Sequence, residues 1–213
     1  VILETIQGGA GFIVPENGYL KKVKKRCEEV GAILILDEIQ TGIGRTGKFW
    51  GFENFGITPD IIISGKGLGG GMPIGAFIAH KHLMDVLKEN PALGHITTFG
   101  GHPVIASAGV ATVNIIQNST LIKDTIVKEL LIRKHLQHPF IKEIRGKGLM
   151  LAAIVESPEL AEKIIHQCLD KGLILFFLLF EGRAIRITPP LTITEKEIIE
   201  GCKILKNVLE ELS

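Results

Sequence analysis

The stretch ILILDEIQTG, Ile33 to Gly42, decides the fold of this chain. Apolar residues continue without interruption from Ala32 to Leu36 and are followed at once by two acids, Asp37 and Glu38. An unbroken apolar run is typical of a strand that is covered on both faces, as in a parallel sheet. The stretch therefore predicts a buried strand over 32–36, and it raises the question of which positive charge the aspartate at its end faces.

Further segments of the first half alternate between strand and helix. Continuous apolar runs predict strands, helical spacing of apolar residues predicts helices, and Gly31 is placed to end the first helix. The expected strands cover residues 1–6, 60–64 and 74–79, and the expected helices cover 19–30 and 103–116. The small residues of the second helix indicate tight packing. This order predicts an α/β domain over residues 1–118 with a mostly parallel sheet.

The character of the chain changes after residue 118, which predicts a smaller α+β domain over 119–213. Thr194 and Glu197 form the pattern of a capping box in front of the last helix. The run LILFFLLF, residues 173–180, is interpreted as core. The expected helices cover 121–136, 158–171 and 195–212, and the expected strands lie within 141–155, 174–180 and 184–188.

Composition excludes several classes of protein. The chain has 213 residues, of which 46% are hydrophobic and 22% charged, with a formal net charge of +1. This balance favours a globular protein and argues against nucleic acid or an anionic membrane as a partner. Three widely spaced cysteines, Cys27, Cys168 and Cys202, favour a reducing compartment. No metal-ligand spacing, signal peptide or membrane span is recognisable, so we expect a cytoplasmic protein. The start within a strand, without Met, suggests a piece of a longer chain.

Two glycine-rich segments match the sequence motif of nucleotide-binding sites. GIGRTG, residues 42–47, and GKGLGG, residues 65–70, both match G-x-G-x-x-G, but neither is followed by a helical pattern on which a pyrophosphate could sit. GIGRTGKF also lacks the hydroxyl residue of an ATP-binding loop, because Phe49 stands in its place. An ATPase built on ILILDE remains an alternative that predicts magnesium-dependent nucleotide binding.

Asp37 and Lys66 both follow the carboxyl ends of expected strands, where ligands bind in open α/β sheets. A desolvated lysine can attack a carbonyl to form a Schiff base, and a carboxylate can keep a ring nitrogen protonated. Together the two residues favour pyridoxal phosphate as cofactor. Taken singly, Asp37 would be a turn residue, Lys66 a solvated lysine and Arg186 a surface ion-pair residue.

The run LDEIQTGIGRTGKFWGFENFGITPDIIISGKGLGGGMPIGA, residues 36–76, resembles the central segment of the class III, ornithine- or acetylornithine-type, pyridoxal-phosphate aminotransferases. Four further segments resemble the same family: ETIQGGAGFIVPENGYL, TTFGGHP, IRGKGLMLA and IRITPPLTITEKE. The resemblance implies fold type I, with part of the large cofactor-binding domain in 1–118 and the small domain in 119–213. It also implies a homodimer with a shared active site.

The resemblance implies a role for each matching residue. Lys66 would form the Schiff base with the cofactor and then move the proton. Asp37 would pair with the pyridinium nitrogen, and Gln40 would bond the phenolic oxygen. Thr98 would contact the cofactor phosphate across the dimer interface, and Thr97 would lie near the substrate. Arg186 would clamp the substrate carboxylate with both arms of its guanidinium fork.

The resemblance leaves the substrate open. An ornithine- or acetylornithine-like donor with 2-oxoglutarate as acceptor is expected. Putrescine or 4-aminobutyrate are alternatives, the diamine because VLKENPALGHITTFGGHP, residues 86–103, resembles the diamine enzymes. Gly9 stands where the ornithine-type enzymes carry a glutamate, and so it cannot pair with Arg186.

The family chain is about twice as long. Its N-terminal half supplies the turn around the cofactor phosphate and an aromatic over the ring, so we expect this chain alone to bind cofactor weakly. A non-catalytic, dimerising fragment is the alternative from another class.

Overall fold

The computed structural model describes residues 1–90, 92 and 95–213, which form two compact units. Unit 1 consists of Val1–Thr5, Glu16–Ile43 and Phe49–Ser119. Unit 2 consists of Ile6–Pro15, Gly44–Lys48 and Thr120–Ser213. The segments 6–15 and 44–48 thus pack with the second half of the chain, although by sequence they lie inside 1–118.

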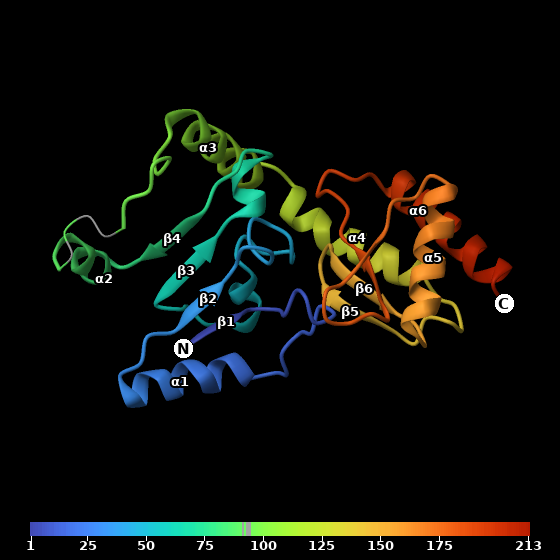
Figure 1. The fold of residues 1–213 in the computed structure, drawn as a ribbon, viewed down its shortest axis with the longest axis horizontal. Helices are drawn as coiled ribbons and strands as arrows, with labels where there is room; N and C mark the ends of the chain where they lie inside the picture. Colours follow the sequence, from blue (N-terminus) through green and yellow to red (C-terminus); the bar gives the residue numbers. More distant parts are fainter. Residues whose placement is uncertain (91, 93–94) are drawn as a thin grey trace. The chain divides into compact units, whose positions relative to one another are not determined.

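Unit 1 is built on a four-stranded sheet in the order β1-β2-β3-β4 (Figure 1). Its strands are β1 (Ile2–Glu4), β2 (Ile35–Asp37), β3 (Ile61–Ser64) and β4 (Ala76–Ala79). The first three are parallel and β4 is antiparallel to β3, which confirms the mostly parallel sheet. Because Asp37 is in register with Ile63, the residues that follow β2 and β3 emerge at the same edge of the sheet.

Helix α1 (Tyr19–Val30) packs against the sheet of unit 1. It has the predicted bounds, and Gly31 ends it at a φ of 68° that favours glycine. Leu20 and Cys27 of α1 pack against the buried Leu34 and Leu36, whereas Ile33 is 41% exposed and Ile35 is half-buried. The prediction of a strand over 32–36 that is buried on both faces is therefore only partly confirmed, because β2 begins at Ile35 and only alternate residues of the run are buried. The remaining elements are η1 (Gly51–Phe55), η2 (Lys66–Gly69), α2 (Lys81–Asp85), η3 (Val86–Lys88) and α3 (Pro103–Gln117).

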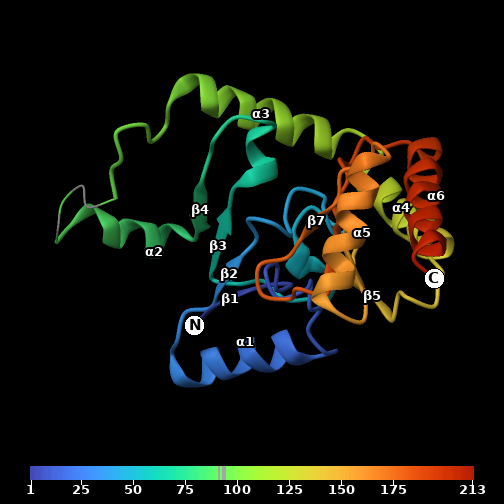
Figure 2. The same cartoon turned by 45° about the vertical axis from the view of Figure 1, so that its right-hand side comes forward.

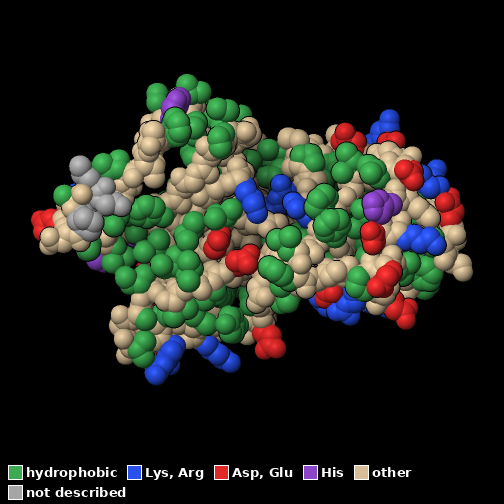
Figure 3. Space-filling view, viewed as in Figure 1, with side chains coloured by type: hydrophobic (Ala, Val, Ile, Leu, Met, Phe, Trp, Pro, Cys, Tyr) green, Lys and Arg blue, Asp and Glu red, His purple; other side chains and the backbone are tan. Residues whose placement is uncertain are grey.

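Helix α3 is not the tightly packed helix that its small residues indicated. Among its residues only Gly109 and Ile116 are buried, and Val104, Val110 and Ile115 are exposed. Figure 3 shows further apolar side chains gathered around β3 and β4 on the face of unit 1 that it displays. Phe77 and Ile78 of β4 are 46% and 45% exposed. Unit 1 therefore presents more apolar surface than an isolated domain of its size needs to.

Unit 2 is an antiparallel sheet covered on one face by three helices (Figure 2). Its strands, in the order β5-β6-β8-β7, are β5 (Glu143–Lys147), β6 (Met150–Ile154), β8 (Ala184–Ile187) and β7 (Phe176–Phe177). Its helices are α4 (Leu121–His135), α5 (Pro158–Asp170) and α6 (Glu195–Glu211). The predicted capping box of α6 is confirmed, because Thr194 and Glu197 bond each other's backbone N–H.

The interpretation of LILFFLLF as core is wrong for most of the run. Leu178 is buried, but Ile174, Phe176, Phe177, Leu179 and Phe180 are all more than half exposed. Only Phe176 and Phe177 form a strand, and that strand lies at the edge of the sheet. An edge strand has a neighbour on one side only, so an apolar sequence there does not imply burial on both faces.

In the part of the chain that the structure describes, no single helix is long and apolar enough to cross a membrane, and α3 and α4 reach that length and composition only as a bent pair.

Candidate active site

The carboxyl edge of the unit 1 sheet brings together three of the predicted site residues. Asp37 is the last residue of β2, Gln40 follows it in the next turn, and Lys66 opens η2 just after β3. The Lys66 Nζ donates to Gln40 Oε1 at 3.4 Å, a long hydrogen bond that holds the amine only weakly. Lys66 is exposed, while Asp37 and Gln40 are half-buried.

One of the two carboxylate oxygens of Asp37 already accepts a hydrogen bond. Its Oδ1 accepts the backbone N–H of Ile39 at 2.8 Å, so part of its role is the turn role expected of an aspartate at a strand end. Among the described residues nothing donates a hydrogen bond to its Oδ2. That oxygen remains available to a ring N–H brought to the sheet edge.

Glu38 fixes the turn that carries Asp37 and Gln40. Its buried carboxylate accepts four hydrogen bonds, two at each oxygen. The donors are the hydroxyls of Thr5 and Thr41 and the backbone N–H groups of Gly51 and Phe52. Burial raises the pKa of Glu38, and these four bonds act in the opposite direction. The bonds join three separate segments of unit 1, so this acid has a structural role.

The backbone at Lys66 has a strained conformation and lies in a turn rich in glycine. Lys66 has a φ of 40°, a conformation that residues with a side chain adopt rarely and that clusters at functional sites. A side chain at Gly70 would place its Cβ 2.3 Å from Thr112 Oγ1, so only glycine fits between η2 and α3. The glycines thus let the turn pack closely while the lysine projects outward.

These residues fit pyridoxal phosphate. An amine with one weak hydrogen bond and a carboxylate with a free oxygen stand at the same sheet edge, which is the pair needed for the aldehyde and the ring nitrogen of this cofactor. No group of three or more His, Cys, Asp or Glu side chains in the described ranges could hold a metal ion.

Thr97 and Thr98 belong to a different loop of unit 1 from Asp37, Gln40 and Lys66. Both are exposed in the loop before α3, where Gly100 N donates to the Thr97 carbonyl at 3.2 Å. Among the described residues, no hydrogen bond joins either threonine to Asp37, Gln40 or Lys66. Of the run 86–103, residues 91, 93 and 94 lie outside the described residues.

Arg186 lies in β8 of unit 2. Its Nε donates to Thr188 Oγ1 at 2.9 Å, and among the described residues no carboxylate forms an ion pair with it. It is therefore not the surface ion-pair residue expected of a lone arginine. Phe176 is its partner in the register of β7, so the two side chains lie on the same face of the sheet.

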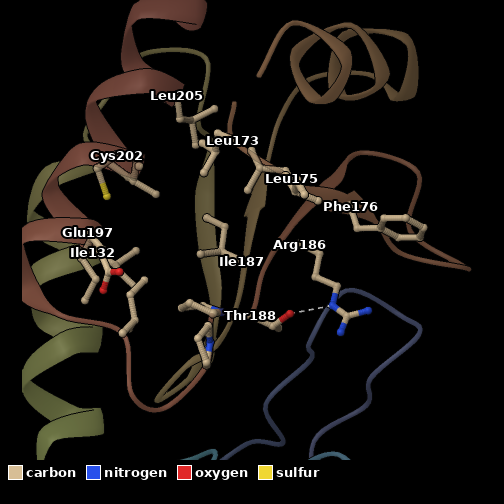
Figure 4. A pocket seen from close by; sticks show the side chains of 17 residues that line it. Ile132, Leu173, Leu175, Phe176, Arg186, Ile187, Thr188, Glu197, Cys202 and Leu205 are labelled. Carbon is tan, nitrogen blue, oxygen red and sulfur yellow. Dashed lines mark hydrogen bonds between the residues drawn. The ribbon is translucent and has the colours of Figure 1, made fainter. Parts of the chain in front are cut away.

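A cavity of about 440 Å³ lies on the helix side of this sheet and is lined mainly by apolar side chains of β8, α6 and the 173–176 segment. Figure 4 shows that Ile187, Cys202 and Leu205 lie on the helix side, while the Arg186 guanidinium points the other way, toward Thr188 Oγ1. The alternation of β8 explains this, because Arg186 and Ile187 must face opposite sides. Arg186 is among the residues that line the cavity, but its guanidinium points away from the helix side.

Sequence analysis missed Arg45. It appeared there only as part of the glycine motif GIGRTG, and nothing in its spacing pointed to the second half of the chain. In unit 2 its Nη1 donates to the carbonyls of Pro189 at 2.5 Å and Leu149 at 3.2 Å. Burial and the neighbouring charge of Arg186 lower the pKa of Arg45 to about 10.

A lysine and an aspartate at the carboxyl edge of a largely parallel sheet define a protein of the fold type I pyridoxal-phosphate class. The family model described as aminotransferase class-III matches residues 1–209, and the chain belongs to that family. It is 41% identical to putrescine aminotransferase of Pectobacterium atrosepticum and 41% identical to acetylornithine aminotransferase of Caldanaerobacter subterraneus subsp. tengcongensis. Both matches cover 100% of this chain, but only 47% and 53% of those proteins.

Solved structures of aminotransferases have the same fold as this chain. A crystal structure of ornithine aminotransferase from Toxoplasma gondii matches 100% of this chain and 52% of its own, with a TM-score of 0.91 and 34% identity. An acetylornithine aminotransferase from Elizabethkingia anophelis matches 99% of this chain and 53% of its own, with a TM-score of 0.90 and 34% identity. The chain thus spans about half the length of its relatives and has the fold of that half.

Proposed function

We propose that this chain carries the lysine-bearing half of a pyridoxal-phosphate-dependent transaminase that moves an amino group from an ornithine- or acetylornithine-like donor to 2-oxoglutarate. The observation that carries the proposal is the cluster of Lys66, Gln40 and the free Asp37 oxygen at one sheet edge. Its membership of the class III family supports the reaction type.

Pyridoxal phosphate, when bound, supplies an aldehyde that exchanges amines and a ring that draws electrons from the substrate carbon. Lys66 would hold the aldehyde group of the cofactor through its Nζ, and the same Nζ would move the proton at the substrate carbon. Asp37 Oδ2 would accept the ring N–H and keep that nitrogen charged. Gln40, whose Oε1 accepts from Lys66 Nζ, would donate its amide N–H to the phenolic oxygen.

Arg186 is proposed to bind the carboxylate of the amino donor and of the 2-oxo acid. Its Nε is bonded to Thr188, while the terminal nitrogens of its fork make no hydrogen bond to the described residues and can take both oxygens of a carboxylate. Thr97 is proposed to stand near the substrate and Thr98 to bind the cofactor phosphate of a neighbouring subunit. The exposed apolar groups of α3 and β4 support association with further protein surface, as a homodimer requires.

Putrescine is the second candidate donor, because the chain is as similar to a putrescine aminotransferase as to an acetylornithine aminotransferase. The absence of a side chain at Gly9 leaves Arg186 without a competing carboxylate from that position. 4-Aminobutyrate, a cytoplasmic location and the non-catalytic alternative stay predictions from the sequence.

The test is borohydride reduction with equimolar pyridoxal phosphate, followed by peptide mass spectrometry. It is applied to this chain and to the longest polypeptide that the gene encodes. We expect the pyridoxyl group on Lys66, with much lower occupancy on the solvated Lys81. In Lys66→Ala, we expect the labelling of Lys81 to stay at this low level. An adduct only on the longer polypeptide supports the need for the second half of the site. Equal labelling of Lys66 and Lys81 in both would overturn the assignment.

A further inference from the structure

Arg45 is anchored to unit 2 through both its backbone and its side chain. Its carbonyl accepts the N–H of Leu149 at 3.0 Å, and its Nη1 returns a hydrogen bond to the Leu149 carbonyl at 3.2 Å. The same Nη1 donates to the Pro189 carbonyl at 2.5 Å. Gly148 allows this approach, because a Cβ there would lie 2.5 Å from the Arg45 carbonyl oxygen. The side chain thus links the start of β6 to the turn after β8.

That turn orients Arg186. Strand β8 ends at Ile187, so Thr188 and Pro189 lie beyond the ladder of the sheet. Thr188 accepts the Arg186 Nε–H, and the next residue, Pro189, is the one that Arg45 holds. Proline donates no backbone hydrogen bond, so its carbonyl is the group by which the turn can be fixed. Arg45 therefore acts on Arg186 through the position of Thr188.

The two arginines also form an uncompensated pair of positive charges. Neither has a carboxylate partner among the described residues, and the two are close enough for Arg186 to lower the pKa of Arg45. Arg145 offers a contrast on the same face of this sheet, where it pairs with Glu143 at 2.8 Å and Glu181 at 3.4 Å. Two half-buried cations without an acid favour an anion between or beside them.

We propose that Arg45 is the positioning residue for Arg186: it fixes the Thr188–Pro189 turn that aims the guanidinium fork, and its own charge strengthens the binding of a carboxylate there. This inference rests on the proposed role of Arg186 in holding substrate carboxylates. It adds a residue whose effect is confined to substrates with a carboxylate and is absent for amines without one.

The alternative is that Arg45 only stabilises the fold of unit 2. Loss of such a residue would lower the stability and would change the KM of all substrates alike. Loss of a positioning residue would affect only ligands with a carboxylate. It would raise the KM for 2-oxoglutarate and the inhibition constant of glutarate, and it would leave the KM for a carboxylate-free diamine unchanged. The split between the two kinds of ligand is therefore the decisive readout.

The experiment uses the longest encoded polypeptide, loaded with pyridoxal phosphate. The variants are Arg45→Met, which removes the charge, Arg45→Lys, which keeps it without the fork, and Thr188→Val, which breaks only the bond to Arg186 Nε. Arg145→Met is the matched control, because it removes an arginine that has its own acidic partners, and Arg186→Met sets the full loss. Thermal melting checks that each variant folds.

We expect Arg45→Met to raise the KM for 2-oxoglutarate and the glutarate inhibition constant about tenfold, with a diamine KM within about twofold. Arg45→Lys and Thr188→Val should fall between it and the parent, and Arg145→Met should match the parent. Equal losses for diamine and 2-oxoglutarate, or no loss, in a folded Arg45 variant would overturn the inference. Should Arg45→Met not fold, Arg45→Lys and Thr188→Val decide on the same criterion. Unchanged carboxylate constants in Arg186→Met would instead refute the substrate role of Arg186.

Discussion

Replacing Glu38 by glutamine should destabilise unit 1, because its carboxylate accepts four hydrogen bonds. Each carboxylate oxygen accepts one hydroxyl and one backbone N–H: Thr5 and Phe52 at Oε1, Thr41 and Gly51 at Oε2. A glutamine offers one oxygen and one NH₂ group, which can only donate. A threonine hydroxyl can rotate to accept from that NH₂, but a backbone N–H cannot.

The magnitude follows from this count. Whichever way the amide is oriented, one buried N–H loses its acceptor, at a cost of about 1–3 kcal/mol. The bonds to the remaining oxygen lose their ionic partner, which costs roughly 1 kcal/mol more. Glutamine avoids the burial of a charge, which offsets part of this loss. After this offset, we expect the free energy of unfolding of unit 1 to fall by about 2 kcal/mol.

The assay is urea unfolding at pH 7, followed by the fluorescence of Trp50. This is the only tryptophan of the chain, and its ring stacks on Phe52 at a centroid distance of 6.4 Å. It therefore reports on the segment that Glu38 holds. The control is Glu53→Gln, the same chemical change at an exposed site where one 3.4 Å bond is at stake, with an expected loss below about 0.5 kcal/mol. A loss for Glu38→Gln no larger than for this control would refute the hydrogen-bond count.

Two further predictions concern unit 2. Gly148→Ala should lower the free energy of unfolding by more than about 3 kcal/mol in urea, because its Cβ would meet the Arg45 carbonyl at 2.5 Å. The control Gly172→Ala, at a similar φ with nothing within 4 Å of its Cβ, should lower it by about 1 kcal/mol. Equal losses would contradict the role of the close approach. Arg183 lowers the pKa of Glu181 from 4.5 to about 2, so the stability that this pair contributes is present above pH 4.5 and is lost as the pH falls toward 2. Acid titration of Glu181→Gln should show a flatter loss across that interval, and parallel curves for variant and parent would contradict it.

The sequence determined what depends on local order along the chain. The helix over 19–30 and the capping box at Thr194 each rest on neighbouring residues, and each formed where it was predicted. The apolar run before Asp37 also led to a strand, although this strand begins only at Ile35. The sheet edge could also be anticipated, because consecutive parallel strands end at the same side. Lys66 and Asp37 therefore lie at the same edge of the sheet.

Only the tertiary structure decided features that depend on segments far apart in the sequence. It exposed most of the 173–180 run, since an edge position is a property of the sheet and not of the run. It gave Glu38 its four donors from three segments. It also placed Arg45 on Pro189, 144 residues away, a contact that no periodicity encodes. Composition and spacing specify which elements form, whereas hydrogen bonds across long loops depend on how those elements pack.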